Sequence, residues 1–152
     1  MRAPELDIKL IRLDEDKERI HFHRWEILRY DGTPVDVNLF TDFSYRAGQH
    51  IVRLSLAARY TTVRELMSRR LLDYGITADF ELIGSDVETS SEEIVVNSDL
   101  VRLMIGVGLG ALRGMVALRT SHTFLAHYPL PVYNVDTLME PIINASRTVN
   151  FY

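Results

Sequence analysis

The residues best suited to chemistry in this chain are two histidines, His21 and His23, which stand two positions apart. Side chains alternate between the faces of a strand, so residues two apart point the same way. Such a pair can ligate a transition metal through imidazole nitrogens. A zinc site needs further ligands, and His50, His122 and His127 are scattered without metal-ligand spacing. We therefore expect no metal, and we keep a metal-dependent enzyme that uses His21 and His23 as an alternative.

Nothing in the sequence demands covalent catalysis. Ser121, His122 and Asp136 supply the residue types of a catalytic triad, but no nucleophile-elbow motif surrounds the serine. The chain has no cysteine, which excludes thiolate chemistry and disulfides. Four acidic residues crowd one polar stretch and are typical of a solvated loop: Asp86, Glu88, Glu92 and Glu93. We expect no catalytic residue, no enzyme activity and no cofactor.

Aromatic side chains offer a different chemistry, the binding of apolar segments. Five of them fall in or beside predicted loops of the N-terminal half: Trp25, Tyr30, Phe40, Phe43 and Tyr45. Phe124 and Tyr128 follow a long predicted helix. Aromatic residues on loops beside a helix can line an apolar groove, although many fill the core instead. We predict that Tyr30, Phe40, Phe124 and Tyr128 bind peptide.

Three glycines, Gly106, Gly110 and Gly114, lie four residues apart in the mostly apolar run Leu100 to Leu118. Residues four apart share one face of a helix, so the glycines form a bare stripe. Each costs about 1 kcal/mol relative to alanine in a helix interior, which calls for a packing reason. A helix that is apolar all round is buried all round. We predict a core helix whose glycines form an oligomer interface, with packing against its own sheet as the alternative.

Two other interpretations of this run are disfavoured. Gly106, Gly108 and Gly110 read G-x-G-x-G, but no strand precedes them, so a nucleotide loop is not expected. A membrane span is not expected either, because three cations interrupt the run: Arg102, Arg113 and Arg119.

Composition indicates an ordinary globular domain. The 152 residues predict one domain, residues 1–152, with 47% apolar and 25% charged residues. The net charge of −4 and the absence of a basic stripe disfavour nucleic-acid binding. Met1 to Asp7 has no apolar core of the signal-peptide type, so we expect a cytoplasmic protein.

Hydrophobic periodicity predicts the strands and helices that carry these residues. Period-2 alternation or β-rich composition predicts strands over residues 8–13, 20–30, 35–39, 52–60 and 72–82. A loop is expected after residue 39, through Arg46-Ala47-Gly48. Thr62 and Glu65 have capping-box spacing, which predicts a short helix between two strands. Strands come first and helices last, an order that favours an α+β fold with helices on one sheet face.

The C-terminal half is organised around the glycine-bearing helix. This helix is expected from about Asp99 to Arg119, followed by an extended Tyr128–Pro131 stretch, because a residue before proline avoids the helical region. Asn134 or Asp136 can cap a final short helix.

This arrangement resembles SecB, the bacterial chaperone family that holds unfolded proteins for export. The family has a four-stranded antiparallel sheet, a long helix, a proline-bearing loop and a short final helix. The segment Leu130-Pro131-Val132-Tyr133-Asn134-Val135-Asp136-Thr137-Leu138 is similar to the family's leucine–proline–asparagine–aspartate segment. The resemblance spans roughly residues 6–142, and about Thr61 to Arg70 forms an additional segment.

The resemblance implies an ATP-independent chaperone that binds non-native polypeptides in apolar grooves. It also implies a tetramer built as a dimer of dimers and, for export, docking to the SecA motor through acidic surfaces. This chain carries a net charge of only −4, and its tail from Ala145 to Tyr152 contains Arg147 and no acid. A dedicated SecB-like chaperone of a single partner, such as an antitoxin, is therefore a second expectation.

Overall fold

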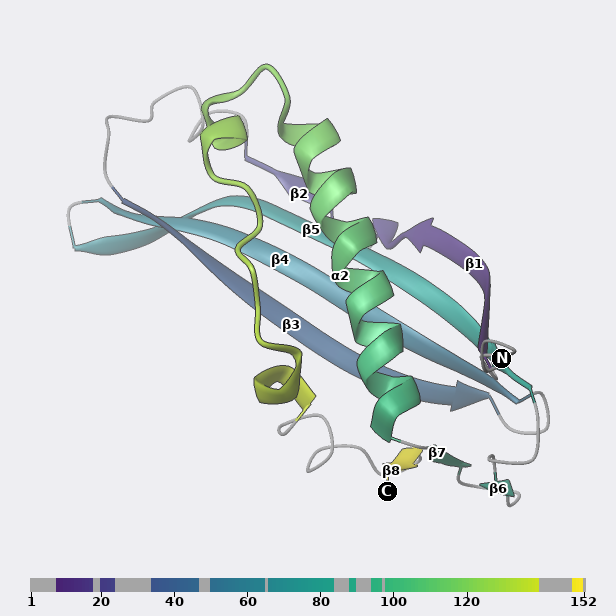
Figure 1. Ribbon diagram of the computed structural model, residues 1–152. Coiled ribbons are helices and arrows are strands. Elements are labelled where there is room, and N and C mark those ends of the chain that lie inside the picture. The colour runs from purple at the N-terminus through teal and green to yellow at the C-terminus, as the bar shows by residue number, and fades with distance from the viewer. Residues whose placement is uncertain are drawn as a thin grey trace, which may run out of the picture.

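The computed structural model describes residues 8–17, 20–23, 34–46, 50–64, 66–83, 88–89, 94–96, 98–139 and 149–151. An antiparallel sheet forms its centre, in the order β1-β5-β4-β3, and the short β2 also pairs with β5. The strands are β1 (Ile8–Glu15), β2 (His21–Phe22), β3 (Val35–Arg46), β4 (Ile51–Arg64) and β5 (Met67–Leu82). A long helix, α2 (Ser98–Thr120), crosses one face of this sheet (Figure 1). The predicted α+β class, an antiparallel sheet packed by a long helix, is confirmed.

A second, small sheet lies at the start of α2 (Figure 1). Its order is β6-β7-β8, with β7 and β8 parallel. The three strands are β6 (Glu88–Thr89), β7 (Ile94–Val96) and β8 (Val149–Phe151). It brings a segment near the C-terminus beside the segment that leads into α2.

Alternation along β4 and β5 decides which sheet face α2 covers. Leu54 pairs with Ala78 and Leu56 with Ile76, so the apolar rows of the two strands coincide. All four residues are at most 1% exposed. A one-residue slip would turn the whole row to the other face, so burial fixes this register. We call the face under α2 the helix side and the opposite face, which carries the intervening polar residues, the open face.

β3 is longer than predicted, because it runs to Arg46 where a loop was expected after Leu39. It pairs with β4 along its whole length. Phe43 is consequently 5% exposed and belongs to the core, so its placement in a loop was wrong. Phe40 lies in the same strand with its side chain 43% exposed on the open face. An exposed phenylalanine obscured the alternation, and only pairing with β4 reveals it.

Among the described residues, no helix forms near residue 62, where a short one was predicted. Thr62 belongs to β4, the chain reverses at Leu66 with φ of 64°, and pairing extends to Arg64 opposite Met67. Glu65, the other half of the expected capping box, lies outside the described residues. Leu66 is fully exposed and Met67 is 57% exposed, so a helix here would have buried no apolar face.

The C-terminal helices follow the prediction closely. α2 differs from the expected range by one residue at each end. A 3-10 helix, η2 (Phe124–His127), follows it, capped by Thr123. Residues 135–139 form the final short helix, and Asn134 Oδ1 accepts a hydrogen bond from the Asp136 backbone N–H at 3.0 Å. We call the extended residues 128–134 between them the strap, which runs beside α2 over the helix side (Figure 1).

α2 is buried on one side only, which corrects the expectation of burial on every side. A Cβ at Gly108 would lie 2.8 Å from both Leu54 Cδ2 and Leu56 Cδ1, so this glycine permits the close approach of helix and sheet. A Cβ at any glycine of the predicted stripe would meet nothing within 4 Å: Gly106, Gly110 and Gly114. The stripe therefore does not fit against the chain's own sheet.

By length and composition, Asp99–Thr120 could cross a membrane, a criterion that core helices of soluble proteins also meet. In this chain one side of the helix packs on the sheet and contributes buried residues to the core: Val101, Met104, Ile105, Leu109, Leu112 and Val116.

Candidate polypeptide-binding surfaces

Large apolar side chains are exposed on the helix side where α2 does not cover the sheet. Leu10 and Leu13 of β1 pair with Phe80 and Ala78 of β5, so they share the helix side with these buried residues. They are nevertheless 42% and 39% exposed, and Phe22 of β2 is 40% exposed. We call Leu10, Leu13 and Phe22 the β1 margin. Phe22 stands opposite Leu72, further along the same edge of β5. Single exposed apolar residues are normal, whereas several along one edge of a sheet mark a candidate interaction surface.

The strap borders α2 on its other flank. The Arg113 guanidinium donates to the carbonyl oxygens of Leu130 at 3.2 Å and Pro131 at 2.9 Å, which fixes the strap backbone to the helix. Leu130 is buried in the core at 3% exposure, whereas Val132 is 92% exposed. The strap is therefore anchored at one point and presents an apolar side chain to solvent.

Two of the predicted groove aromatics meet at one end of the strap. The rings of Phe124 and Tyr128 make an edge-to-face contact, with centroids 6.3 Å apart and planes at 83°. Both are half-buried and pack against the core. Phe40 lies on the opposite face of the sheet, so the structure separates it from this pair. Tyr30 lies outside the described residues. Peptide binding by these residues stays a prediction.

The outward face of α2 carries small and apolar residues between the exposed side chains of Arg102 and Arg119. It carries the exposed glycine stripe, and Val107 and Leu118 are 40% and 75% exposed. A bare helical surface of this kind allows a second helix backbone to approach closely. The oligomer interface assigned to Gly106, Gly110 and Gly114 stays a prediction.

A network of charges ties β1 to the C-terminal end of α2. Glu15 accepts a hydrogen bond from the Tyr74 hydroxyl at 2.5 Å, and Arg119 Nη2 contacts both of its carboxylate oxygens at 2.7 Å. The hydrogen bonds from Arg119 and then Tyr74 lower the pKa of Glu15. Burial, with the neighbouring Glu15, raises the pKa of Tyr74 to about 12. This network fixes the end of β1 to the last turn of α2.

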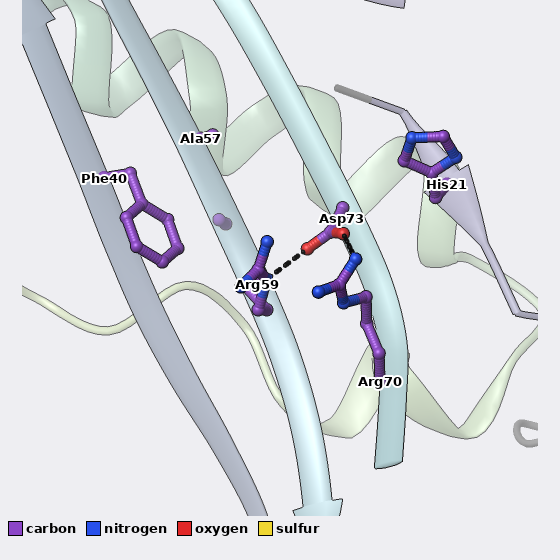
Figure 2. Close-up of a pocket in the computed structure, with 7 residues that line it drawn as sticks. His21, Phe40, Ala57, Arg59, Arg70 and Asp73 are labelled. Atoms are coloured by element: carbon purple, nitrogen blue, oxygen red, sulfur yellow. Dashed lines mark hydrogen bonds and ion pairs between the residues drawn. The ribbon is translucent and has the colours of Figure 1, made fainter. Parts of the chain in front are cut away.

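The open face carries a second cluster, built from polar positions of neighbouring strands. Arg59 Nε lies 2.8 Å from Asp73 Oδ1, and Arg70 Nη1 lies 3.1 Å from Asp73 Oδ2. The Arg59 guanidinium also stands 5.1 Å from the centroid of the Phe40 ring. These residues and His21 line a shallow depression of about 330 Å³. Figure 2 shows both arginines converging on the one carboxylate.

The two histidines of the metal alternative border this charged region. His21 lines the depression with Arg59 and Arg70, and His23 lines an adjoining one that shares the same two arginines. The guanidinium groups would repel a divalent cation, and Asp73 is already held by both arginines. Across the described part of the chain, no group of three or more histidine, cysteine, aspartate or glutamate side chains could hold a metal ion.

Sequence reasoning missed the β1 margin and the arginine cluster for different reasons. The run around Leu10 predicts a strand, but the exposure of its side chains depends on how far α2 covers the sheet, which the sequence does not specify. Arg59 and Asp73 occupy the polar positions of two correctly predicted strands. Their contact follows once the register of β4 against β5 is known. The sequence pattern does not specify that register.

Comparison with known proteins finds similarity among solved structures. No family model matches the chain, and no curated protein matches it. Among solved structures, the chain is similar to the Mycobacterium tuberculosis SecB-like chaperone Rv1957 in complex with a ChAD peptide from the HigA1 antitoxin. The identity is 14%, the match covers 84% of this chain and 83% of that one, and the TM-score is 0.43. The functional assignment of this chain therefore rests on the geometry of its own surfaces.

Proposed function

We propose that this protein is an ATP-independent chaperone that holds non-native polypeptides, acting in the cytoplasm without a cofactor. The observation that carries the proposal is the β1 margin, because Leu10, Leu13 and Phe22 expose apolar surface on the same side as the core. The resemblance to SecB in the order of strands, long helix, proline-bearing strap and short helix points to the same activity.

Binding at such a surface follows from hydrophobic burial alone. Removing apolar surface from water contributes about 25 cal/mol per Å², from which the cost of ordering the bound segment is subtracted. The β1 margin lies at an edge of the sheet, where β1 offers backbone groups to an extended segment as well as side chains. On the other flank of α2, Val132, Phe124 and Tyr128 provide further apolar contacts.

We also propose that the protein is a homo-oligomer, a dimer of dimers, in which the outward face of α2 packs against a second copy. The glycine stripe supports this, because each exposed glycine costs helix stability and gains nothing within the single chain. Replacing Gly110 with leucine would fill the space that a partner helix needs. Sedimentation of Gly110→Leu should show smaller species than the wild type, and an unchanged oligomer would contradict this interface.

The charges of the open face do not favour docking to the SecA motor. That role calls for an acidic sheet face, whereas here basic residues stand among the acids: Arg12, Arg53, Arg59 and Arg70. A dedicated chaperone of one partner, such as an antitoxin, is therefore the second candidate function. It uses the same apolar surfaces and differs in the number of polypeptides that it accepts.

The test is a light-scattering assay of aggregation with several chemically unfolded clients and no nucleotide. The wild type should slow aggregation, and the double variant Leu10→Ser with Leu13→Ser should slow it less. Leu66→Ser is the matched control, because Leu66 is fully exposed at the β4–β5 hairpin and lies outside the β1 margin. A thermal melt of each variant separates lost binding from lost folding.

The outcomes distinguish the two candidate functions. A folded wild type that protects none of the clients at several-fold excess contradicts a general chaperone. If it still forms a stoichiometric complex with one polypeptide recovered from its source cell, the dedicated function stands. Equal loss of protection in Leu66→Ser and the double variant would remove the β1 margin from the proposal.

A further inference from the structure

On the open face, Arg59, Arg70 and Asp73 form a charged cluster that lies outside the proposed chaperone surfaces. Arg53 donates two hydrogen bonds of 2.7 and 3.0 Å to the carboxylate of Asp79, so each charge has an opposite charge in contact. In the neighbouring cluster, two guanidinium groups share the single carboxylate of Asp73. Two cationic groups in direct contact therefore share one anionic group, in a protein whose net charge is −4.

The two guanidinium groups of this cluster retain donors for a ligand. A guanidinium has five N–H donors, and Asp73 is contacted by Arg59 through Nε and by Arg70 through Nη1. Both arginine side chains are open to solvent, at 37% and 45% exposure, whereas that of Asp73 is only 11% exposed. The buried carboxylate of Asp73 thus positions both arginines and leaves their remaining guanidinium N–H groups accessible to solvent, a geometry suited to carboxylate recognition.

The walls of the depression limit what can bind there. Phe40 offers an exposed ring beside Arg59, and Ala57 lines the floor between the two strands, so the cavity combines an apolar wall with cationic donors. On β3, Asp36 and Asp42 flank Phe40 on the open face and are exposed. These acids would repel the continuous phosphate backbone of a nucleic acid, whereas a peptide with one or two carboxylates can place them between the arginines.

We propose that this depression is a docking site for an acidic peptide segment of a partner protein, in which a carboxylate binds Arg59 and Arg70 beside an apolar side chain on Phe40. The site lies on the opposite sheet face from the β1 margin and the strap, so it can be occupied while a client is held. It is independent of the chaperone proposal, because none of its residues belongs to those surfaces.

The test is fluorescence anisotropy with a short labelled peptide that contains glutamate and one leucine, compared with the same peptide carrying glutamine. The glutamate peptide should bind more tightly, and its affinity should fall as salt rises from about 50 to about 200 mM. Arg70→Gln and Arg59→Gln should each weaken binding by about threefold to tenfold, the range expected for a partly exposed charge contact. Each variant leaves Asp73 one arginine partner, which protects the fold.

Arg12→Gln is the matched control, because it removes the same charge from the same sheet face outside the depression, where Arg12 pairs with Asp14. It should change the affinity less than twofold. Equal weakening by Arg12→Gln, or equal binding of the glutamine peptide, would overturn the proposal. Tighter binding of a single-stranded oligonucleotide through Arg59 and Arg70 would also overturn it, in favour of a nucleic-acid site.

Discussion

The close approach of α2 to the sheet depends on one glycine, Gly108, and this can be tested by changing it. In Gly108→Ala the new Cβ would lie 2.8 Å from Leu54 Cδ2 and Leu56 Cδ1, closer than carbon atoms pack. Both leucines are buried at 0% and 1% exposure, so they have little room to move. Overpacking costs about 1–3 kcal/mol, and the gain in helix propensity returns about 1 kcal/mol. We expect Gly108→Ala to lower the free energy of unfolding by up to about 2 kcal/mol.

Leu54→Val supplies the compensating change. Valine lacks the Cδ2 atom that meets the new methyl group, and removing one buried methylene costs about 0.8 kcal/mol before any cavity term. In the double variant the added methyl fills part of the vacated space. Its loss of stability should therefore be smaller than the sum of the single losses, with a coupling energy of at least about 0.5 kcal/mol.

The measurement is urea unfolding of the wild type, both single variants and the double variant, followed by circular dichroism. Equal slopes with denaturant allow the midpoints to be compared as free energies. Losses that add within about 0.3 kcal/mol would contradict a direct contact between residue 108 and Leu54. A Gly108→Ala variant stabilised by about 1 kcal/mol, the full gain in helix propensity, would contradict it as well.

Three further predictions concern single side chains. Because folding lowers the pKa of Glu15, this residue contributes stability that is fully present above its unfolded-state pKa of 4.5 and is lost as the pH falls through its folded-state pKa. Glu15→Gln should therefore reduce the loss of stability at acid pH, measured by urea unfolding across a pH series. Tyr74→Phe removes the hydrogen bond to Glu15 and should lower the free energy of unfolding by about 1.5 kcal/mol. Tyr60→Phe should be neutral or stabilising, because the buried Tyr60 hydroxyl has no hydrogen-bond partner among the described residues. Thermal melts compare the two variants. Arg113→Gln should free the strap, seen as a lower NMR backbone order parameter at Val132, and an unchanged order parameter would show that the strap is held without Arg113.

Much of the architecture could be predicted from periodicity. The alternation of Leu54 and Leu56 with polar residues predicted β4, and the apolar run from Leu100 to Leu118 predicted α2 within one residue at each end. The end of β3 and the β4–β5 hairpin could not be predicted, because Phe40 breaks the alternation and backbone pairing leaves no mark on the sequence. The capping-box spacing of Thr62 and Glu65 imitated a helix start, in a segment too short for hydrophobic periodicity to distinguish helix from strand.

The candidate sites were less accessible to sequence reasoning. Side-chain type suggested aromatic binding residues, yet Phe40 and Phe124 lie on opposite sides of the sheet, a distinction that depends on strand parity across the whole of β3. The sequence predicts the glycine stripe, but the glycine that contacts the sheet is Gly108, two residues from Gly106 and Gly110 and so on the opposite side of the helix. Burial of a helix face is a tertiary property, and an apolar helix gives no internal signal of which side is covered.

The most direct test of the chaperone proposal is a methyl-labelled NMR titration of the protein with an unfolded polypeptide. We expect chemical-shift changes at the methyl groups of Leu10 and Leu13 in the β1 margin and at Val132 in the strap, with the methyl groups of Leu66 at the exposed hairpin unchanged. Shift changes confined to Leu66, or none at a client concentration that saturates a known chaperone, would contradict it.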